Sequence, residues 1–231
     1  MNEMLWVVML IINFGAILIA YRIWGKLGLY LWVPISVIVA NIQVTKTVNL
    51  FGLEATLGNI VYASGFLVTD ILSECFSKKE SRKAIGIGFF ALISMTIMMQ
   101  LAIMFNPAPS DFVQDSMVNI FSFMPRIMIA SLIAYFISNH HDIIAYEFWK
   151  KKFPSTKMIW LRNNASTFVS QLIDSIIFTL IAFYGVFEMD ILIEIVISTY
   201  ILKWVVAILD TPFIYLAKKW FDEGKINTSI N

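Results

Sequence analysis

Residues 4–21 read MLWVVMLIINFGAILIAY, a run without a single charged side chain. A run of this length predicts a membrane-spanning α-helix, because about 20 apolar residues at about 1.5 Å each cross the hydrocarbon core of a bilayer. Glu3 precedes the run and no Lys or Arg does, so the basic region of a cleaved signal peptide is missing. We therefore expect this first helix to stay in the protein.

Six further apolar runs follow the first one. Together the seven runs cover residues 4–21, 27–44, 57–76, 84–105, 119–138, 165–187 and 191–217. Each is long enough to span a bilayer. We predict an all-α, polytopic transmembrane helical bundle of about seven spans, or six if the first run does not cross. The connections are too short for a second domain, so we expect one transmembrane domain over residues 1–231, ending in a short cytoplasmic tail at 218–231.

The composition agrees with this class. Hydrophobic residues make up 59% of the 231 residues and charged residues only 14%, against about a quarter charged in a soluble domain. Such a chain has too little polar surface for water, so its expected solvent is the lipid bilayer. A formal net charge of +1 gives no field that would attract nucleic acid. The single cysteine, Cys75, excludes an intramolecular disulfide and a cysteine-rich metal site.

Basic residues gather in alternate connections, after the first, third, fifth and seventh runs. They are Arg22, Lys26, Lys78, Lys79, Arg82, Lys83, Lys150, Lys151, Lys152, Lys157, Arg162, Lys218, Lys219 and Lys225. Lys and Arg near the ends of spans remain on the cytoplasmic side. The pattern therefore predicts a multi-pass protein of the cell membrane with its N-terminus outside and its C-terminus in the cytoplasm.

Ionisable residues inside the predicted spans are candidates for function, because each costs about 2.5 to 3.5 kcal/mol to insert. Asp70 and Glu74 lie four residues apart, on one face of a helix. They repel each other unless a proton, a cation or a donor-rich ligand lies between them. The alternative is structural: Glu74 reaches the membrane interface and Asp70 caps a neighbouring helix.

A polar stripe marks the sixth run, where Ser166, Ser170 and Asp174 recur at every fourth position beside Thr167 and Gln171. Such a stripe faces a protein interior or a water-filled cavity. Hydrogen bonds between helices account for the hydroxyl groups. A carboxylate is a costly substitute for a serine, so we interpret Asp174 as a residue that binds a solute.

Two bases accompany these acids. Lys203 lies about two turns from Asp210 on the seventh run, and we expect it to neutralise a buried carboxylate such as Asp174. Arg126 opens the fifth run, where it either contributes to a site or extends to lipid phosphates. The acids remain in excess, which suits a cationic or donor-rich solute, or a coupling proton.

Other polar residues are less decisive. Asn41 and Gln43 supply donors and acceptors either for a polar ligand or for helix packing. His140 and His141 have no acidic or cysteine partner at metal-ligand spacing, so we expect no metal site and no cofactor. The chain carries no hydrolase, zinc-protease or phosphate-loop motif, which makes a membrane enzyme the weaker hypothesis.

Eight segments carry a family resemblance through their order and spacing. They are Ala40-Asn41-Ile42-Gln43 with Lys46, Phe66 to Glu74, Lys79 to Gly88, Pro107 to Asp111, Ala130 to Tyr135, Trp160 to Thr167, Ser170 to Asp174, and Lys203 with Asp210-Thr211-Pro212. From about residue 40 onwards the chain thus resembles the YhhQ-type queuosine-precursor transporters, also called the vitamin uptake transporter family. Ala165 and the Asn139-His140 pair depart from the family pattern, which often has Gly and Gln there.

The resemblance implies import of 7-cyano- and 7-aminomethyl-7-deazaguanine, with queuine as a further candidate, for queuosine in transfer RNA. A guanine-like edge presents an N–H and an amino group that one carboxylate accepts together. The aminomethyl form is a cation, which suits the surplus of acids. Two alternatives stay open: a substrate-binding subunit of a modular vitamin importer, which needs an energising partner, and a membrane-embedded enzyme. Neither the oligomeric state nor a partner follows from the residues.

Overall fold

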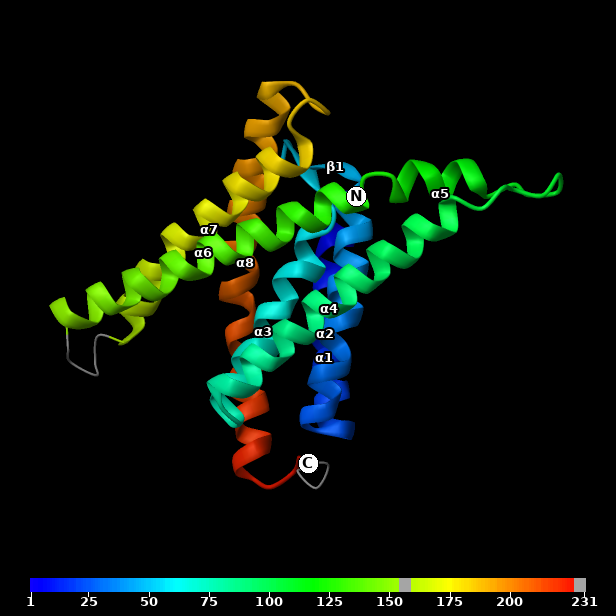
Figure 1. The fold of residues 1–231 in the computed structure, drawn as a ribbon. Helices are drawn as coiled ribbons and strands as arrows, with labels where there is room; N and C mark the ends of the chain where they lie inside the picture. The colour runs from blue at the N-terminus through cyan, green and yellow to red at the C-terminus, as the bar shows by residue number, and fades with distance from the viewer. Residues whose placement is uncertain (154–158, 227–231) are drawn as a thin grey trace. The chain divides into compact units, whose positions relative to one another are not determined.

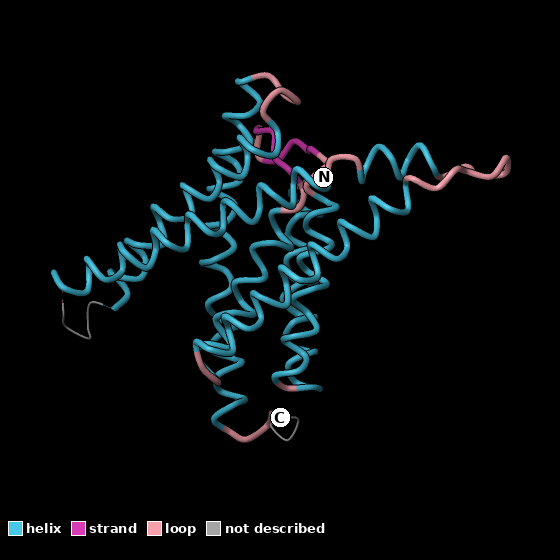
Figure 2. Tube along the Cα trace, in the orientation of Figure 1, coloured by secondary structure: helices cyan, strands magenta, loops and turns pink. Residues whose placement is uncertain are grey.

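The computed structural model describes residues 1–153 and 159–226, and most of them are helical (Figures 1 and 2). The elements are α1 (Asn2–Trp24), α2 (Lys26–Gln43), β1 (Thr47–Leu50), β2 (Leu53–Thr56), α3 (Asn59–Cys75), α4 (Lys78–Ile103), α5 (Gln114–Phe121), α6 (Met124–Lys152), α7 (Ile159–Phe183) and α8 (Met189–Asp222). The predicted all-α class is confirmed. Within the described ranges, five helical stretches are long and apolar enough to cross a membrane: Asn2–Trp24, Lys26–Gln43, Lys78–Ile103, Gln114–Ser138 and Met189–Asp222. A count of six or seven spans stays a prediction.

The chain divides into two compact units. Unit 1 contains residues 1–125 and the chain from residue 201, and unit 2 contains residues 126–200. The long helix α8 therefore begins in unit 2 and ends in unit 1. The expected fifth run is not one helix: α5 ends at Phe121, and α6 begins at Met124 and continues to Lys152.

The core of unit 1 is built by α1, α2, α3 and the second part of α8. Phe14 of α1 is buried, and its ring centroid lies 4.7 Å from that of Phe213 on α8. Leu67 of α3 is also fully buried. The outer side of α1 exposes large apolar residues such as Ile12 and Ile19. Exposed apolar surface of this extent is stable against lipid and not against water.

Two glycines allow the helices of unit 1 to approach closely. A Cβ atom at Gly28 would lie 2.1 Å from the carbonyl oxygen of Ala20, and one at Gly58 would lie 2.4 Å from that of Ala40. Any side chain at either position would force the backbones apart. Gly58 thus sets the crossing of α2 and α3 beside the polar residues at the end of α2.

A β-hairpin connects α2 to α3, and the sequence patterns did not predict it. Its antiparallel register pairs Thr47 with Thr56 and Leu50 with Leu53. The two loop residues, Phe51 and Gly52, have φ angles of 53° and 83°, as a two-residue hairpin turn requires. Phe-Gly is a weak turn signal, since Asn-Gly or Asp-Gly usually marks this turn.

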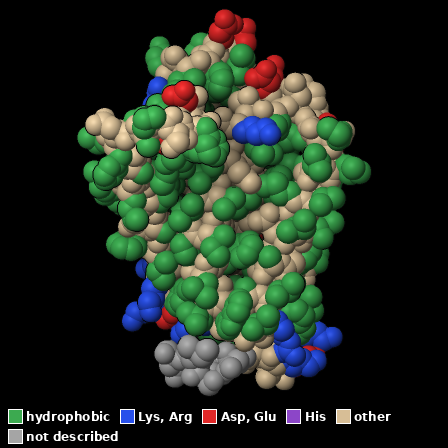
Figure 3. Space-filling view, turned by 90° about the vertical axis from the view of Figure 1, so that its right-hand side faces the viewer, with side chains coloured by type: hydrophobic (Ala, Val, Ile, Leu, Met, Phe, Trp, Pro, Cys, Tyr) green, Lys and Arg blue, Asp and Glu red, His purple; other side chains and the backbone are tan. Residues whose placement is uncertain are grey.

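One end of unit 1 is basic. The Arg22 guanidinium lies 5.7 Å from the centroid of the Trp220 ring, and Lys26 lies 3.7 Å from a Glu80 carboxylate oxygen. The end of α1 and the starts of α2 and α4 therefore meet there. The hairpin lies at the other end, joined by a hydrogen bond to the start of α1. Figure 3, drawn from the side of α4 and α5, shows Lys and Arg gathered at the lower end of that face and apolar side chains over its middle.

Candidate functional site

The ten candidate residues fall into two sets, one in each unit. Unit 1 contains Asn41, Gln43, Asp70, Glu74, Lys203 and Asp210, and unit 2 contains Arg126, Ser170, Gln171 and Asp174. The expected pairing of Lys203 with Asp174 would join the two units and stays a prediction.

In unit 2, α6 and α7 share a layer of polar contacts. Asp174 of α7 is buried, and its Oδ1 accepts a hydrogen bond of 3.3 Å from the Ser138 hydroxyl of α6. The Nδ1 atom of His141 lies 3.0 Å from the Oγ atom of Ser170. The contacts pair position 138 with 174 and position 141 with 170. Moving one turn forward along α6 thus moves one turn back along α7, as expected for antiparallel helices. This layer places a buried carboxylate beside hydroxyl and imidazole groups.

Gln171 adds a second acceptor to this layer. Its Oε1 atom is buried and has no hydrogen-bond partner among the described residues. A buried, unpaired amide oxygen costs about 1 to 3 kcal/mol, so this atom is suited to accept a donor from a bound molecule. Gln171 and Asp174 are three residues apart on α7 and therefore lie on one side of the helix. Together they present two neighbouring acceptors.

Arg126 is engaged with the end of α7. Its Nε donates to the carbonyl oxygen of Ile181 and its Nη2 to that of Tyr184, both at 2.6 Å. The last carbonyl groups of a helix lack partners within the helix, and a cation there also interacts favourably with the helix dipole. At least two donors of Arg126 thus stabilise the α7 terminus.

In unit 1, polar residues cluster where α2 ends and α3 begins. Asn41 is buried and donates to the Val37 carbonyl at 2.7 Å. Gln43 is partly buried, and its Oε1 has no hydrogen-bond partner in the described part of the chain. Lys203 of α8 is buried, with its Nζ 5.2 Å from the centroid of the Tyr62 ring of α3. This cation–π contact compensates part of the cost of burying the ammonium.

A second polar level of unit 1 contains carboxylates. Asp210 of α8 is buried, whereas Asp70 and Glu74 of α3 are exposed. Asp210 interacts electrostatically with Asp70, and Asp70 with Glu74. The predicted proximity of Asp70 to Glu74 is therefore present, and α8 adds a third acid.

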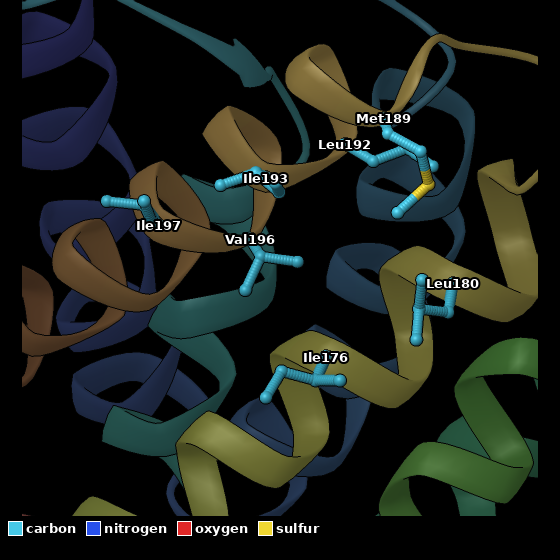
Figure 4. Close-up of a pocket in the computed structure, with 7 residues that line it drawn as sticks. All are labelled: Ile176, Leu180, Met189, Leu192, Ile193, Val196 and Ile197. Carbon is cyan, nitrogen blue, oxygen red and sulfur yellow. The ribbon is translucent and has the colours of Figure 1, made fainter.

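An apolar cavity of about 210 Å³ lies in unit 2. Figure 4 shows its lining, which comes from α7 and the first part of α8: Ile176, Leu180, Met189, Leu192, Ile193, Val196 and Ile197. All seven side chains are apolar, so the cavity offers no partner for the polar edge of a base.

Three contact residues escaped the sequence analysis. Ser138 was not a candidate and His141 was considered only as a metal ligand, because both lie at the end of the predicted fifth run, where serine and histidine usually serve packing or solvation. Their spacing of three residues, which puts them on one helix face, was the available signal. Tyr62 was missed because aromatic residues are common in this chain and only the contact with Lys203 distinguishes it.

Comparison with known proteins identifies the family. Residues 56–217 match the model of a family described as "Putative vitamin uptake transporter". A Bacillus subtilis (strain 168) protein named "Probable queuosine precursor transporter" is 43% identical over 218 residues, covering 94% of this chain and 95% of the relative. A Haemophilus influenzae protein with the same name is 25% identical over 136 residues, or 59% of this chain and 55% of the relative. No solved structure matches. The chain therefore belongs to the vitamin uptake transporter family.

Proposed function

We propose that this protein imports queuosine precursors across the cytoplasmic membrane for queuosine salvage. The candidate solutes are 7-cyano- and 7-aminomethyl-7-deazaguanine, with queuine as a third. The observation that carries the proposal is the 43% identity over 94% of the chain with a relative named as such a transporter. The apolar helices and the buried polar layer of unit 2 support it, because a polar solute crossing lipid needs an interior lined by hydrogen-bonding groups.

Unit 2 supplies the groups that would recognise a guanine-like base. The ring N–H and the exocyclic amino group are both donors, and the Asp174 carboxylate and the Gln171 Oε1 are acceptors on one side of α7. Hydrogen bonds to a charged acceptor contribute about 1.5 to 3 kcal/mol each. We assign Asp174 the role of reading this edge, with Gln171 as its neighbour.

The proposed orientation has the N-terminus outside and the C-terminus in the cytoplasm. The basic end of unit 1 supports it, because Lys and Arg mark the cytoplasmic side. A tag fused before Met1 should be accessible in intact cells. Access only after permeabilisation would contradict this orientation.

The function is tested in a host that neither makes nor imports queuosine precursors and has no energising module of the vitamin importers. With the protein expressed alone, a low external concentration of precursor should restore queuosine in transfer RNA. Restoration only together with an energising module would identify a substrate-binding subunit instead. Chemical conversion of the solute by the purified protein would identify an enzyme.

A further inference from the structure

Two carboxylates of unit 1 approach each other from different helices. Asp210 is 3% exposed, and no described residue donates a hydrogen bond to it or forms an ion pair with it. Two contacts join α8 to α3 on either side of it: the Lys203 Nζ lies 5.2 Å from the centroid of the Tyr62 ring, and the ring centroids of Phe221 and Phe76 are 5.3 Å apart. Asp70 lies between the same two contacts on α3, so it faces Asp210. Asp70 is exposed, so it forms the accessible side of the pair.

The nearest cation on α8 does not neutralise this pair. Lys203 lies over the Tyr62 ring, seven residues and therefore about 10 Å along α8 from Asp210. Tyr62 and Asp70 are separated by a similar distance along α3, so the two helices run in the same direction with the ammonium at one level and the carboxylates at the next. Glu74, one turn beyond Asp70, adds negative charge, and Lys218 of α8, which is paired with Asp222, faces Glu74 from the next level.

The apolar parts of α1, α2 and α4 contain no charged side chain. Residues 4–21 of α1, 27–43 of α2 and 84–103 of α4 contain no Asp, Glu, Lys or Arg. Two neighbouring ionised carboxylates repel each other, and the buried one, Asp210, also pays a desolvation cost. Such a pair is stable only when a cation lies between its members or when one of them holds a proton.

We propose that Asp70 and Asp210 bind a monovalent cation, H⁺ or Na⁺, whose entry down its gradient drives solute uptake. The inference rests on the proposed import function for its physiological role. The site consists of these two carboxylates of unit 1 and uses none of the acceptors assigned to solute recognition. Asp210 is the buried ligand, and Asp70 is the ligand at the entrance.

The coupling is tested with the full chain in liposomes and labelled 7-aminomethyl-7-deazaguanine. One proton or one Na⁺ per solute allows about tenfold accumulation for a tenfold cation gradient. Asp210→Asn and Asp70→Asn should accumulate no solute above the external concentration, yet still exchange internal for external solute. Asp222→Asn, on the same helix but exposed and paired with Lys218 at 2.9 Å, should accumulate like the unmodified protein.

The outcomes separate the two proposals. Exchange without any response to a pH or Na⁺ gradient in the unmodified protein would overturn the cation site and leave import intact. Absence of exchange in the unmodified protein would overturn import. Gradient-driven accumulation by Asp210→Asn would overturn the assignment of the site. If Asp210→Asn lost both exchange and accumulation, Asp210 would belong to solute binding instead.

A second measurement needs neither solute nor a variant. Dicyclohexylcarbodiimide reacts with protonated carboxyl groups in apolar surroundings, and mass spectrometry locates the adduct. Asp210 should be modified several-fold faster than Asp222. Slowing by higher pH alone identifies a proton site, and slowing by added Na⁺ at constant pH identifies a sodium site. Equal modification of Asp210 and Asp222 under all conditions would overturn the proposal.

Discussion

The two polar clusters differ in how they hold their charge. In unit 2, the Asp174 carboxylate accepts a hydrogen bond of 3.3 Å from the Ser138 hydroxyl. In unit 1, Lys203 of α8 lies against the Tyr62 ring. Asp210, about two turns further along α8, faces a second acid, Asp70. A carboxylate beside hydroxyl and amide groups discriminates ligands by their pattern of donors. A layer of like charges instead requires a cation, so we assign recognition to unit 2 and coupling to unit 1.

The largest expected effect is at Asp174. Asp174→Asn keeps the size but replaces one acceptor with a donor, which then faces the donors of the solute. We expect affinity to fall about ten- to a hundredfold, from a loss of about 1.5 to 3 kcal/mol, with the protein still present in the membrane. Queuosine in transfer RNA at low external precursor measures it.

The control for this change is Asp190→Asn, an exposed acid at the start of α8 in the same unit. It should support normal queuosine levels. Normal queuosine with Asp174→Asn would remove recognition from unit 2, and loss of the protein from the membrane would make Asp174 a structural residue.

Gly58→Ala tests whether the cluster of unit 1 depends on the close crossing of α2 and α3. A Cβ atom 2.4 Å from the Ala40 carbonyl forces the helices apart, which should cost about 1 to 3 kcal/mol of stability. Thermal unfolding in detergent measures the loss. Gly65→Ala, where a Cβ meets nothing within 4 Å, is the matched change in the same helix. Equal stability of the two variants would show that the crossing adjusts freely.

Lys203→Met tests whether the buried ammonium group contributes to stability and uptake. It removes the contact with Tyr62, worth about 0.5 to 2 kcal/mol, and a buried positive charge of α8. Lys219→Met removes an exposed lysine of the same helix. We expect lower stability and less uptake for Lys203→Met, and near-normal behaviour for Lys219→Met. Indistinguishable, normal variants would mean that the charge of Lys203 has no role.

Arg126→Gln should give the smallest effect. It weakens the bonds to the carbonyls of Ile181 and Tyr184 at the end of α7. Because the arginine is partly exposed, we expect a loss of about 1 kcal/mol of stability. Arg126→Lys should recover part of it, since an ammonium keeps the charge but not the fork geometry. A large drop in solute affinity at unchanged stability would instead place Arg126 in the recognition layer.

Sequence patterns predicted the features that depend on local composition. Runs of apolar residues determine which segments leave water, and the excess of Lys and Arg in alternate connections predicts an orientation. The stripe of Ser170, Gln171 and Asp174 followed from helical periodicity alone. Phe51-Gly52 gave too weak a turn signal to predict the hairpin. Pro125, a residue type common in the first turn of a helix, was the available signal for the start of α6 and hence for the interruption after Phe121.

Only the tertiary structure decided which residues meet. Asp210 was a candidate from its chemistry, but its proximity to Asp70 depends on how α8 packs beside α3. Arg126 had two possible roles until the end of α7 was placed beside it. Hydrophobicity and helical period are properties of neighbouring residues, so a sequence displays them directly. Contacts between positions separated by 55 residues, such as Arg126 with Ile181, or by still more, as for Asp70 with Asp210, depend on the packing of whole helices, because many helix rotations bury similar amounts of apolar surface.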